Sequence, residues 1–347
     1  MRLAVPLAGE RSADWEGAAA FAAAAERLGV HSVWTAEAWG FDAVTPLAFV
    51  AARTSRIGLG TGIMQVGART PAMVAMTAAT MRSLTGGRFI LGLGASGPQV
   101  VEGWHGVPFD RPLVRIRETI EIVRAVLRGE RLQYEGEVFT LPLPGGRGRA
   151  LRSSAPPGPV PIYVASLAPR SLELTGELGD GWVGGSFVPE SAGVFLDPLR
   201  TGAERAGRRL EDLDLQVAVS VEFGDDVEAI ARNHARGYAF TFGAMGSATR
   251  NFYLDAFARQ GFGEAAREVQ RLWLEGRRED AADRVPLELA LRSNLLGPDA
   301  AVRERLRAYR AAGITTLRAA VRGITLAARV EALERLAGLL AEVNAGL

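Results

Sequence analysis

The sequence predicts an α/β fold, a (β/α)8 TIM barrel with inserted segments, from three observations. Short apolar segments alternate with amphipathic segments along most of the 347 residues. Eight of the apolar segments have the length of buried strands, and strands that alternate with helices pair in parallel. Eight such units close into a barrel with its catalytic residues at the carboxyl ends of the strands. The eight segments are 3–8, 31–36, 56–63, 88–94, 161–165, 181–187, 215–223 and 314–321.

Helical patterns connect these strands. Thr45 and Pro46 have the residue types of an N-cap and a first helical position. The segment 113–127 carries an apolar stripe at spacings of three and four residues, which is typical of a surface helix. The expected helices are 14–28, 45–53, 71–84, 113–127, 169–178, 190–206, 298–312 and a last one through 330–343.

Three segments interrupt the alternation. We expect a long loop at 95–110, a hairpin at 131–141 and a loop rich in proline, glycine and arginine at 143–161. A helical insertion is expected near 238–284, because the segment there is longer than a simple crossover needs. The whole chain, 1–347, is predicted to form a single domain. An open, doubly wound sheet is the alternative, but its glycine fingerprint is missing after the first strand, where the sequence reads G-E-R-S-A-D.

The composition indicates a globular protein without a nucleic-acid or membrane partner. Hydrophobic residues make up 48% and charged residues 23% of the chain, and the net charge is +1. The amino terminus has too short an apolar segment for a secretory signal, and no segment approaches the roughly 20 apolar residues of a membrane span. We therefore expect a cytoplasmic enzyme that acts on a small molecule.

The absent residue types exclude several kinds of chemistry. The chain has no lysine for a Schiff base or a Walker motif, and no cysteine for a nucleophile, a disulfide or a thiolate metal site. His31, His105 and His234 lie far apart in the sequence. No metal is therefore expected, and a metal-dependent barrel hydrolase is disfavoured, although carboxylates alone could still bind a hard cation.

Glycine marks the carboxyl ends of two neighbouring strands. The segments 57–64 and 89–94 are apolar and rich in glycine, and an amphipathic segment, 71–84, separates them. Glycine in a strand usually marks a bulge or a close approach of a ligand. These strand ends are therefore the first place to look for a binding site.

Several sequence motifs resemble the bacterial luciferase-like superfamily. They are L-T-G-G-R-F-I-L-G-L-G at 84–94, R-I-G-L-G-T-G-I at 56–63 and the hairpin Y-E-G-E-V-F-T-L at 134–141. The loop S-G-P-Q-V-V-E-G-W-H-G-V-P-F at 96–109 is similar to the deazaflavin-dependent branch, which includes methylenetetrahydromethanopterin reductase. The resemblance extends over essentially the whole chain and specifies no substrate.

The resemblance implies a TIM barrel that binds coenzyme F420, or FMN in other branches, across the carboxyl ends of its strands. It places a non-proline cis peptide that backs the ring at Gly62-Ile63. Ser166 lies before the amino terminus of a helix, where backbone N–H groups suit the coenzyme phosphate, and Arg170 could add positive charge. The implied cofactor-binding residues are Glu37, Thr61, Gly62, Ile63, Ser96, Gly97, Pro98, Gln99, Ala165, Ser166, Leu167, Gly184 and Gly185.

Candidate acid and base residues are less clearly indicated. The resemblance implies an acidic residue near the coenzyme at Glu37, but Ala38 stands where relatives often have a catalytic histidine. Glu102 and His105 lie in the loop after the fourth strand and are the nearest candidates for a general acid or base. The predicted catalytic residues are therefore Glu37, Glu102 and His105. A plain structural role is the alternative for each of them.

These observations predict an F420-dependent oxidoreductase that transfers a hydride between the deazaflavin and an unidentified organic substrate. An FMN-dependent monooxygenase on the same fold is one alternative, and a flavin-binding protein without turnover is another. The resemblance also implies a homodimer, since the family commonly dimerises through barrel helices.

Overall fold

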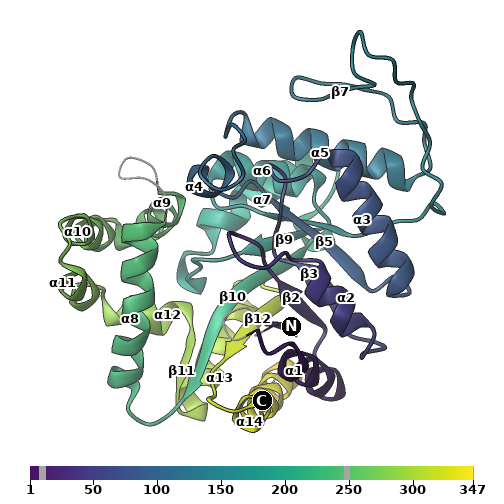
Figure 1. Ribbon diagram of the computed structural model, residues 1–347. Helices are drawn as coiled ribbons and strands as arrows, with labels where there is room; N and C mark the ends of the chain where they lie inside the picture. Colours follow the sequence, from purple (N-terminus) through teal and green to yellow (C-terminus); the bar gives the residue numbers. More distant parts are fainter. Residues whose placement is uncertain (8–12, 246–250, 347) are drawn as a thin grey trace.

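The computed structural model describes residues 1–7, 13–245 and 251–346, and it confirms the predicted barrel (Figure 1). Every pairing between neighbouring barrel strands is parallel, and β9 pairs with β10 through Gly181 and Asp214 to close the sheet. The barrel strands are β1 (Arg2–Pro6), β2 (Ser32–Thr35), β3 (Gly58–Thr61), β5 (Phe89–Gly94), β8 (Ile162–Ala165), β9 (Gly181–Gly184), β10 (Asp214–Phe223) and β12 (Thr316–Val321). Ala8, the expected last residue of the first strand, lies outside the described residues.

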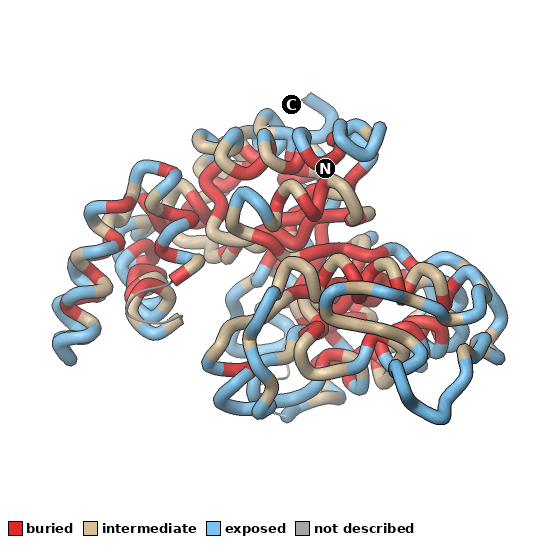
Figure 2. The backbone as a smooth tube through the Cα atoms, turned by 90° about the horizontal axis from the view of Figure 1, so that it is seen from above, coloured by how far each residue is buried: buried red, intermediate tan, exposed pale blue. Residues whose placement is uncertain are grey.

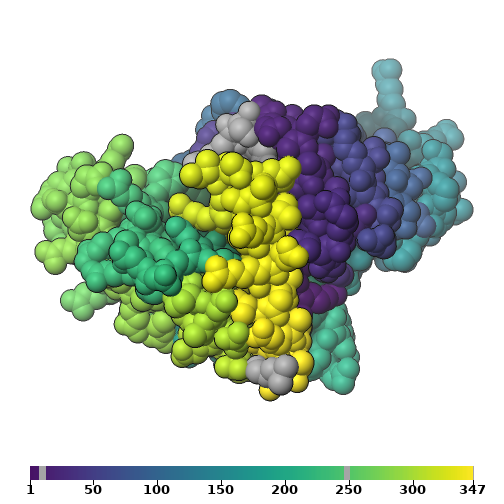
Figure 3. Space-filling model, turned by 90° about the horizontal axis from the view of Figure 1, so that it is seen from below, coloured from purple at the N-terminus to yellow at the C-terminus, as the bar shows by residue number. Residues whose placement is uncertain are grey.

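Helices surround the barrel, and most of the core lies between them and the strands (Figure 2). Along β10, Leu215, Val217 and Val219 alternate outward into this core, so the residues between them point into the barrel. Figure 3 shows the last helix beside the amino-terminal segments. The surrounding helices are α1 (Trp15–Arg27), α2 (Thr45–Ala51), α3 (Pro71–Leu84), α5 (Pro112–Leu127), α6 (Pro169–Leu178), α7 (Gly193–Arg205), α13 (Asp299–Ala311) and α14 (Leu326–Ala345).

Two aromatic side chains fill the middle of the barrel. The rings of Trp34 and Tyr163 lie 5.6 Å apart between their centroids, within a small cluster that also contains Ala4, Ile90 and Val183. Gly60 makes room for Trp34, because a Cβ at that position would lie 2.5 Å from the indole ring. Side chains therefore fill the middle of the barrel interior.

A polar cluster closes the amino end of the barrel. The Asp214 carboxylate pairs with the guanidinium of Arg2 at 2.8 Å and accepts hydrogen bonds from the hydroxyls of Tyr163 and Thr316 at 2.8 and 2.7 Å. Burial alone would raise the pKa of Asp214, but hydrogen bonds from Thr315 and Thr316 and the charge of Arg2 lower it. The charges at this end of the barrel are therefore paired.

The segment from β10 to α13 contains a helical lobe, which projects from one side of the barrel (Figure 1). The lobe has its own hydrophobic cluster, which includes Phe242, Phe257 and Leu289. The expected insertion at 238–284 lies inside it, except for residues 246–250, which are not described. The lobe consists of α8 (Val227–Ala244), α9 (Phe252–Phe257), a π-helical turn (Ala258–Phe262), α10 (Gly263–Leu274), α11 (Arg278–Asp283) and α12 (Leu287–Ser293).

Gln260 fixes this lobe to the segment that follows β9. Its side-chain oxygen accepts a hydrogen bond from the backbone N–H of Val188 at 2.8 Å, and its side-chain nitrogen donates to the carbonyl of Ser186 at 2.6 Å. The lobe is therefore held close to the carboxyl ends of the strands.

Short elements and one helix cap differ from the expectation. β4 (Met64–Gln65) pairs with β5, and β11 (Leu295–Gly297) pairs with β10. Pro98–Val101 forms a short helix, α4, inside the expected loop, and the expected hairpin forms from Tyr134–Glu135 and Thr140–Leu141. The N-cap prediction for Thr45 is wrong. Helix α2 follows Val44, and the carboxylate of Asp42 instead accepts hydrogen bonds from the backbone N–H groups of Val44 and Thr45, both at 2.8 Å.

Within the described ranges, no helix combines the length and the apolar character needed to cross a membrane.

Candidate active site

A cavity of about 330 Å³ opens at the carboxyl ends of the barrel strands. Its lining residues come from β1, β2, β10 and β12, from the residues that follow β1, β2 and β3, and from the end of α12. They include Pro6, Trp34, Ala36, Gly62, Asn294 and Arg318. A second cavity of about 160 Å³ lies between the strands and the lobe and is lined by Tyr238, Tyr253 and Phe257, among others. Ala218 and Asn294 line both cavities, which are therefore neighbours.

The end of β3 forms one wall of the larger cavity. The Gly62-Ile63 peptide bond is cis, as the resemblance implies. The Thr61 hydroxyl donates to the carbonyl of Gly92 and accepts from its backbone N–H, both at 2.9 Å, which ties β3 to β5. Gly92 has to be glycine, because a Cβ there would lie 1.8 Å from the carbonyl oxygen of Thr61. Thr61 therefore acts within the sheet, and Gly62 faces the cavity.

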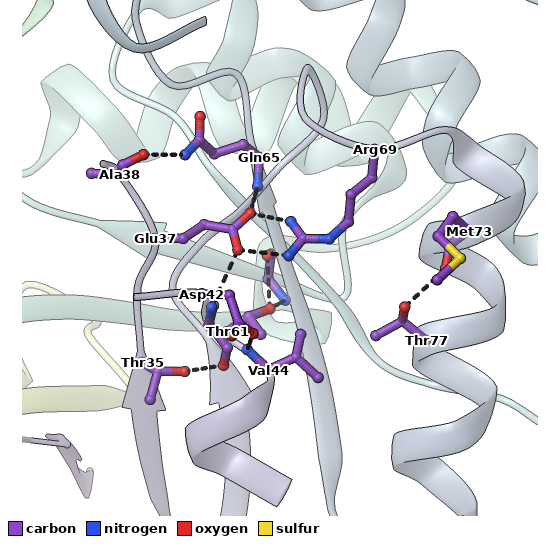
Figure 4. A network of polar contacts seen from close by, with 12 residues as sticks. Thr35, Glu37, Ala38, Asp42, Val44, Thr61, Gln65, Arg69, Met73 and Thr77 are labelled. Atoms are coloured by element: carbon purple, nitrogen blue, oxygen red, sulfur yellow. Dashed lines mark hydrogen bonds and ion pairs between the residues drawn. The ribbon is translucent and has the colours of Figure 1, made fainter. Parts of the chain in front are cut away.

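Glu37 is held by a network beside this wall (Figure 4). Arg69 binds its carboxylate through both guanidinium nitrogens. The backbone N–H groups of Gln65 and Ala43 donate to the same carboxylate at 2.8 and 3.2 Å. Only 7% of the Glu37 side chain is exposed. Because these four donors occupy the carboxylate, the geometry favours a positioning role for Glu37 over proton transfer.

Gln65 extends this network toward Ala38. Its side-chain nitrogen donates to the carbonyl of Ala38 at 3.1 Å, whereas its side-chain oxygen is buried and has no partner among the residues that the structure describes. A buried polar atom without a partner is uncommon and calls for an explanation. This oxygen is enclosed by protein, and Gln65 lines neither of the two cavities.

The loop after β5 places some of its predicted site residues on the exposed surface. Ser96 has a left-handed backbone with φ of 61°, after which Gly97 is extended and Pro98 begins α4. Glu102 and His105 follow α4 on the exposed surface, and the carboxylate of Glu102 accepts a hydrogen bond from the backbone N–H of Phe109 at 3.1 Å. Neither of these two lines the described cavities. Their catalytic role stays a prediction.

The ends of β8 and β9 lie side by side, because Ala165 pairs with Val183. The Ser166 hydroxyl is buried and bonded to the hydroxyl of Thr175 at 2.8 Å, and its carbonyl accepts a hydrogen bond from the Trp182 indole at 2.9 Å. Its backbone N–H is what remains for a ligand. Helix α6 begins after Ala168 without a side-chain cap. A Cβ at Gly185 would have no neighbour within 4 Å, whereas Gly184 packs closely on Trp182.

Arg259 brings a positive charge to the same place. It lies in the lobe, and its guanidinium donates to the carbonyl of Leu167 at 2.5 Å. Arg170, which the sequence suggested for this purpose, is exposed on α6. Sequence reasoning missed Arg259 because 92 residues separate it from Leu167.

Arg318 was also missed. Its side chain lines the larger cavity, and a Cβ at Gly62 would lie 2.6 Å from one of its guanidinium nitrogens. The guanidinium carbon lies 6.0 Å from the centroid of the Trp34 ring. Burial lowers the pKa of Arg318 to about 10. The sequence did contain a signal for Arg318, because it is a charged residue inside the otherwise apolar strand T-L-R-A-A-V.

No group of three or more candidate metal ligands occurs in residues 1–7, 13–245 and 251–346.

Comparison with known proteins identifies the family. The sequence profile of the family described as "Luciferase-like monooxygenase" matches residues 3–316. The chain belongs to this luciferase-like family. The family and the names of its relatives make it an enzyme of the luciferase-like type, an oxidoreductase.

Two relatives of this luciferase-like chain have names that state a reaction or a coenzyme. A Mycobacterium tuberculosis protein with the provisional name coenzyme F420-dependent oxidoreductase is 40% identical over 304 residues, which are 85% of this chain and 88% of that protein. The 5,10-methylenetetrahydromethanopterin reductase of Methanolobus tindarius is 31% identical over 228 residues, 65% of this chain and 67% of that protein. The solved F420-dependent tetrahydromethanopterin reductase of Methanopyrus kandleri has a TM-score of 0.81 at 22% identity and covers 99% of both chains. This last likeness shows the shared fold.

Proposed function

We propose that this luciferase-like enzyme binds coenzyme F420 and transfers a hydride between the deazaflavin and a small organic substrate. The names of the relatives from Mycobacterium tuberculosis and Methanolobus tindarius support this branch of the family. The observation that carries the proposal is the mouth of the barrel. There the bend at Gly62-Ile63 borders a cavity of about 330 Å³, and the uncapped start of α6 lies beyond the ends of β8 and β9.

The residues at the mouth fit such a coenzyme. Gly62, at the cis bond with Ile63, lines the cavity and offers a wall for a ring. Ser96 to Gln99 and the open position at Gly185 would border the tail. The backbone N–H groups at the start of α6, together with Arg259, suit its phosphate.

The coenzyme, when bound, supplies the hydride transfer itself, and the protein supplies orientation, charge and exclusion of water. The Glu37–Arg69 pair would hold the strand end behind the ring in place. Tyr238 and Tyr253 form the lobe side of the second cavity and would exclude water from the substrate. The hydroxyl of Tyr253, which lines this cavity, can donate a hydrogen bond to a substrate oxygen.

The test is a titration of the purified protein with coenzyme F420 and, separately, with FMN, followed by absorbance and fluorescence. The proposal predicts micromolar binding of F420 and little affinity for FMN. Preferential binding of FMN would instead support the monooxygenase alternative, which the family description favours. Binding of neither would contradict the proposed chemistry and leave the fold unaffected.

The tail site has its own test. Gly185→Trp places a large side chain in open space at the end of β9, where it would obstruct the coenzyme without a clash in the protein. We expect the affinity for F420 to fall at least about tenfold. Gly148→Trp, also at an open position but in the exposed loop after the hairpin, is the matched control and should bind as wild type. Equal affinities of both variants would place the tail elsewhere.

We also propose that the chain forms a homodimer through its barrel helices. Met73 and Met76 on α3 support this proposal, because 51% and 57% of these apolar residues are exposed and they lie one helical turn apart. Light scattering should give twice the mass of the chain for the wild type and a lower mass for Met76→Glu. A monomeric wild type would refute the proposal.

A further inference from the structure

Arg318 occupies an inward position in the middle of β12. In the register of the sheet it lies between Ala4 of β1 and Ala218 of β10, whose small side chains leave space around it. Its neighbours along the strand, Leu317 and Ala319, point outward into the core between strands and helices. The guanidinium therefore enters the mouth of the barrel, where it borders the cavity of about 330 Å³.

This guanidinium has no ion pair and no hydrogen bond with any residue that the structure describes. Its recorded neighbours are the ring of Trp34 and the backbone at Gly62. Other arginines near the strands are satisfied, such as Arg2 by Asp214 at 2.8 Å and Arg69 by Glu37. Burying an unpaired charge is costly, and a partner normally accompanies it. Arg318 is thus left without the partner that its environment requires.

The cavity provides polar groups but no compensating charge. Ser220 and Asn294 are among its lining residues, and Arg318 is its one charged lining residue in the part of the chain that the structure describes. The side-chain oxygen of Asn294 is already bonded to the backbone N–H of Ser220 at 2.9 Å. The cavity therefore carries a net positive charge and has room for a small molecule.

We propose that Arg318 binds a carboxylate group of the substrate, so that the enzyme acts on a small organic acid held beside the coenzyme ring. This inference rests on the proposed function. A planar guanidinium binds a carboxylate through two parallel hydrogen bonds, which fixes both the position and the orientation of the acid. Arg318 is on this account the specificity-determining residue of the enzyme.

The first experiment compares two probes of similar shape, benzoate and benzamide, by calorimetry and by tryptophan fluorescence, since Trp34 lies beside Arg318. Wild type should bind benzoate about tenfold to a hundredfold more tightly than benzamide, which corresponds to the loss of a charged hydrogen bond. In Arg318→Met this preference should disappear. Equal binding of the two probes by wild type, or an unchanged preference in Arg318→Met, would overturn the proposal, and so would a failure of benzoate to bind at millimolar concentration.

Arg322→Met is the matched control. Arg322 lies just beyond the same strand, but it is exposed and pairs with Glu222 at 3.3 Å. This variant removes the same charge without touching the cavity, so the preference for benzoate should stay as in wild type. A preference lost equally in both variants would show a general charge effect and would refute a specific role for Arg318.

Folding of Arg318→Met is a second readout. Removing an unpaired charge should leave the Tm unchanged or raise it by roughly 1–3 °C. A lower Tm, together with a preserved preference for benzoate in the more conservative Arg318→Gln, would assign Arg318 to the structure and overturn the proposal. Loss of the preference in Arg318→Gln supports it, even if Arg318→Met does not fold.

Arg318 could bind an anionic oxygen of the substrate or of the coenzyme, and a titration with coenzyme F420 distinguishes the two. Arg318→Met should bind F420 within about threefold of wild type. A loss of more than about tenfold with an unchanged preference for benzoate would assign Arg318 to the coenzyme and overturn the proposal. If wild type binds no F420 yet prefers benzoate through Arg318, the proposed function fails and the carboxylate site stands.

Discussion

The two ends of the barrel each contain an arginine that burial partly desolvates, and the two side chains differ in what they bind. At the amino end, Arg88 donates five hydrogen bonds to oxygens of Ala51, Thr54, Ile57 and Thr85. At the carboxyl end, Arg318 donates none to any described residue. Burial lowers the pKa of both guanidinium groups. The same residue type therefore stabilises the fold at one end and is left for a ligand at the other.

Two further polar side chains can be compared at the same two ends. Near Arg88, the carboxylate of Glu26 accepts hydrogen bonds from the backbone N–H groups of Ser55, Arg56 and Ile57, and these bonds outweigh desolvation and lower its pKa to about 2. At the mouth, the side-chain oxygen of Gln65 has no partner within the described ranges. Pairing at the amino end is not complete, because both polar side-chain atoms of the buried Gln216 lack a partner among the described residues. The contrast between the two ends therefore rests on the paired Arg88 and Glu26 and on the unpaired Arg318, which lies at the end of the barrel where ligands bind.

The largest expected effect is a difference in stability between variants of Arg88 and Arg318. Arg88→Met should lower the free energy of unfolding by about 3 kcal/mol, because several oxygens lose their donor at once. Arg318→Met should not lower it. Urea unfolding of both variants measures the difference, with Arg56→Met, an exposed position, as the control. Similar losses for Arg88→Met and Arg318→Met would remove the distinction between the two ends.

A smaller effect is expected at the wall of the mouth. Glu37→Gln keeps the size of the side chain but weakens its bonds to Arg69, so the strand end near Gly62 should become less well positioned. We expect the affinity for F420 to fall about tenfold and the free energy of unfolding to fall by only about 1 kcal/mol.

The control for Glu37→Gln is Glu16→Gln, which loosens an exposed ion pair with Arg53. A titration with F420 and urea unfolding measure the two quantities for both variants. A Glu37→Gln protein that loses stability but binds F420 as wild type would show that the network serves the fold alone.

The smallest effect concerns His234, which is buried in α8 and lies 2.8 Å from the Glu222 carboxylate. Burial lowers the pKa of His234 from 6.5, the nearby Arg322 lowers it further, and Glu222 only partly opposes this. The unfolded chain therefore takes up a proton first as the pH falls. Stability should be highest above pH 6.5 and decrease below it.

His234→Gln should make this decrease shallower. Urea unfolding at a series of pH values around 6.5 gives the slopes. His31, at the amino end, also has a pKa lowered by burial, so some pH dependence should persist in His234→Gln. An identical slope in wild type and His234→Gln would contradict this assignment.

The sequence predicted the barrel because its strands are short apolar segments with glycine at their ends, a local pattern. The resemblance also located the cis bond at Gly62-Ile63. The contact between Arg259 and Leu167 could not be predicted from the sequence, because Arg259 belongs to the lobe, 92 residues further along the chain. Arg318 could have been noticed, since a charge at an inward strand position is unusual, but its lack of a partner appears only in the folded structure. Asp42 took the capping role expected of Thr45 because its carboxylate reaches two backbone N–H groups at once.

A crystal structure of the protein with coenzyme F420 would test the central claim most directly. The account predicts that the ring lies against Gly62-Ile63, that the tail passes Ser96–Gln99, and that the phosphate lies at the start of α6 near Arg259. It also predicts that Arg318 faces the remaining space beside the ring. A coenzyme bound away from the Gly62-Ile63 wall, or with its phosphate on the β10 and β12 side of the mouth, would contradict it.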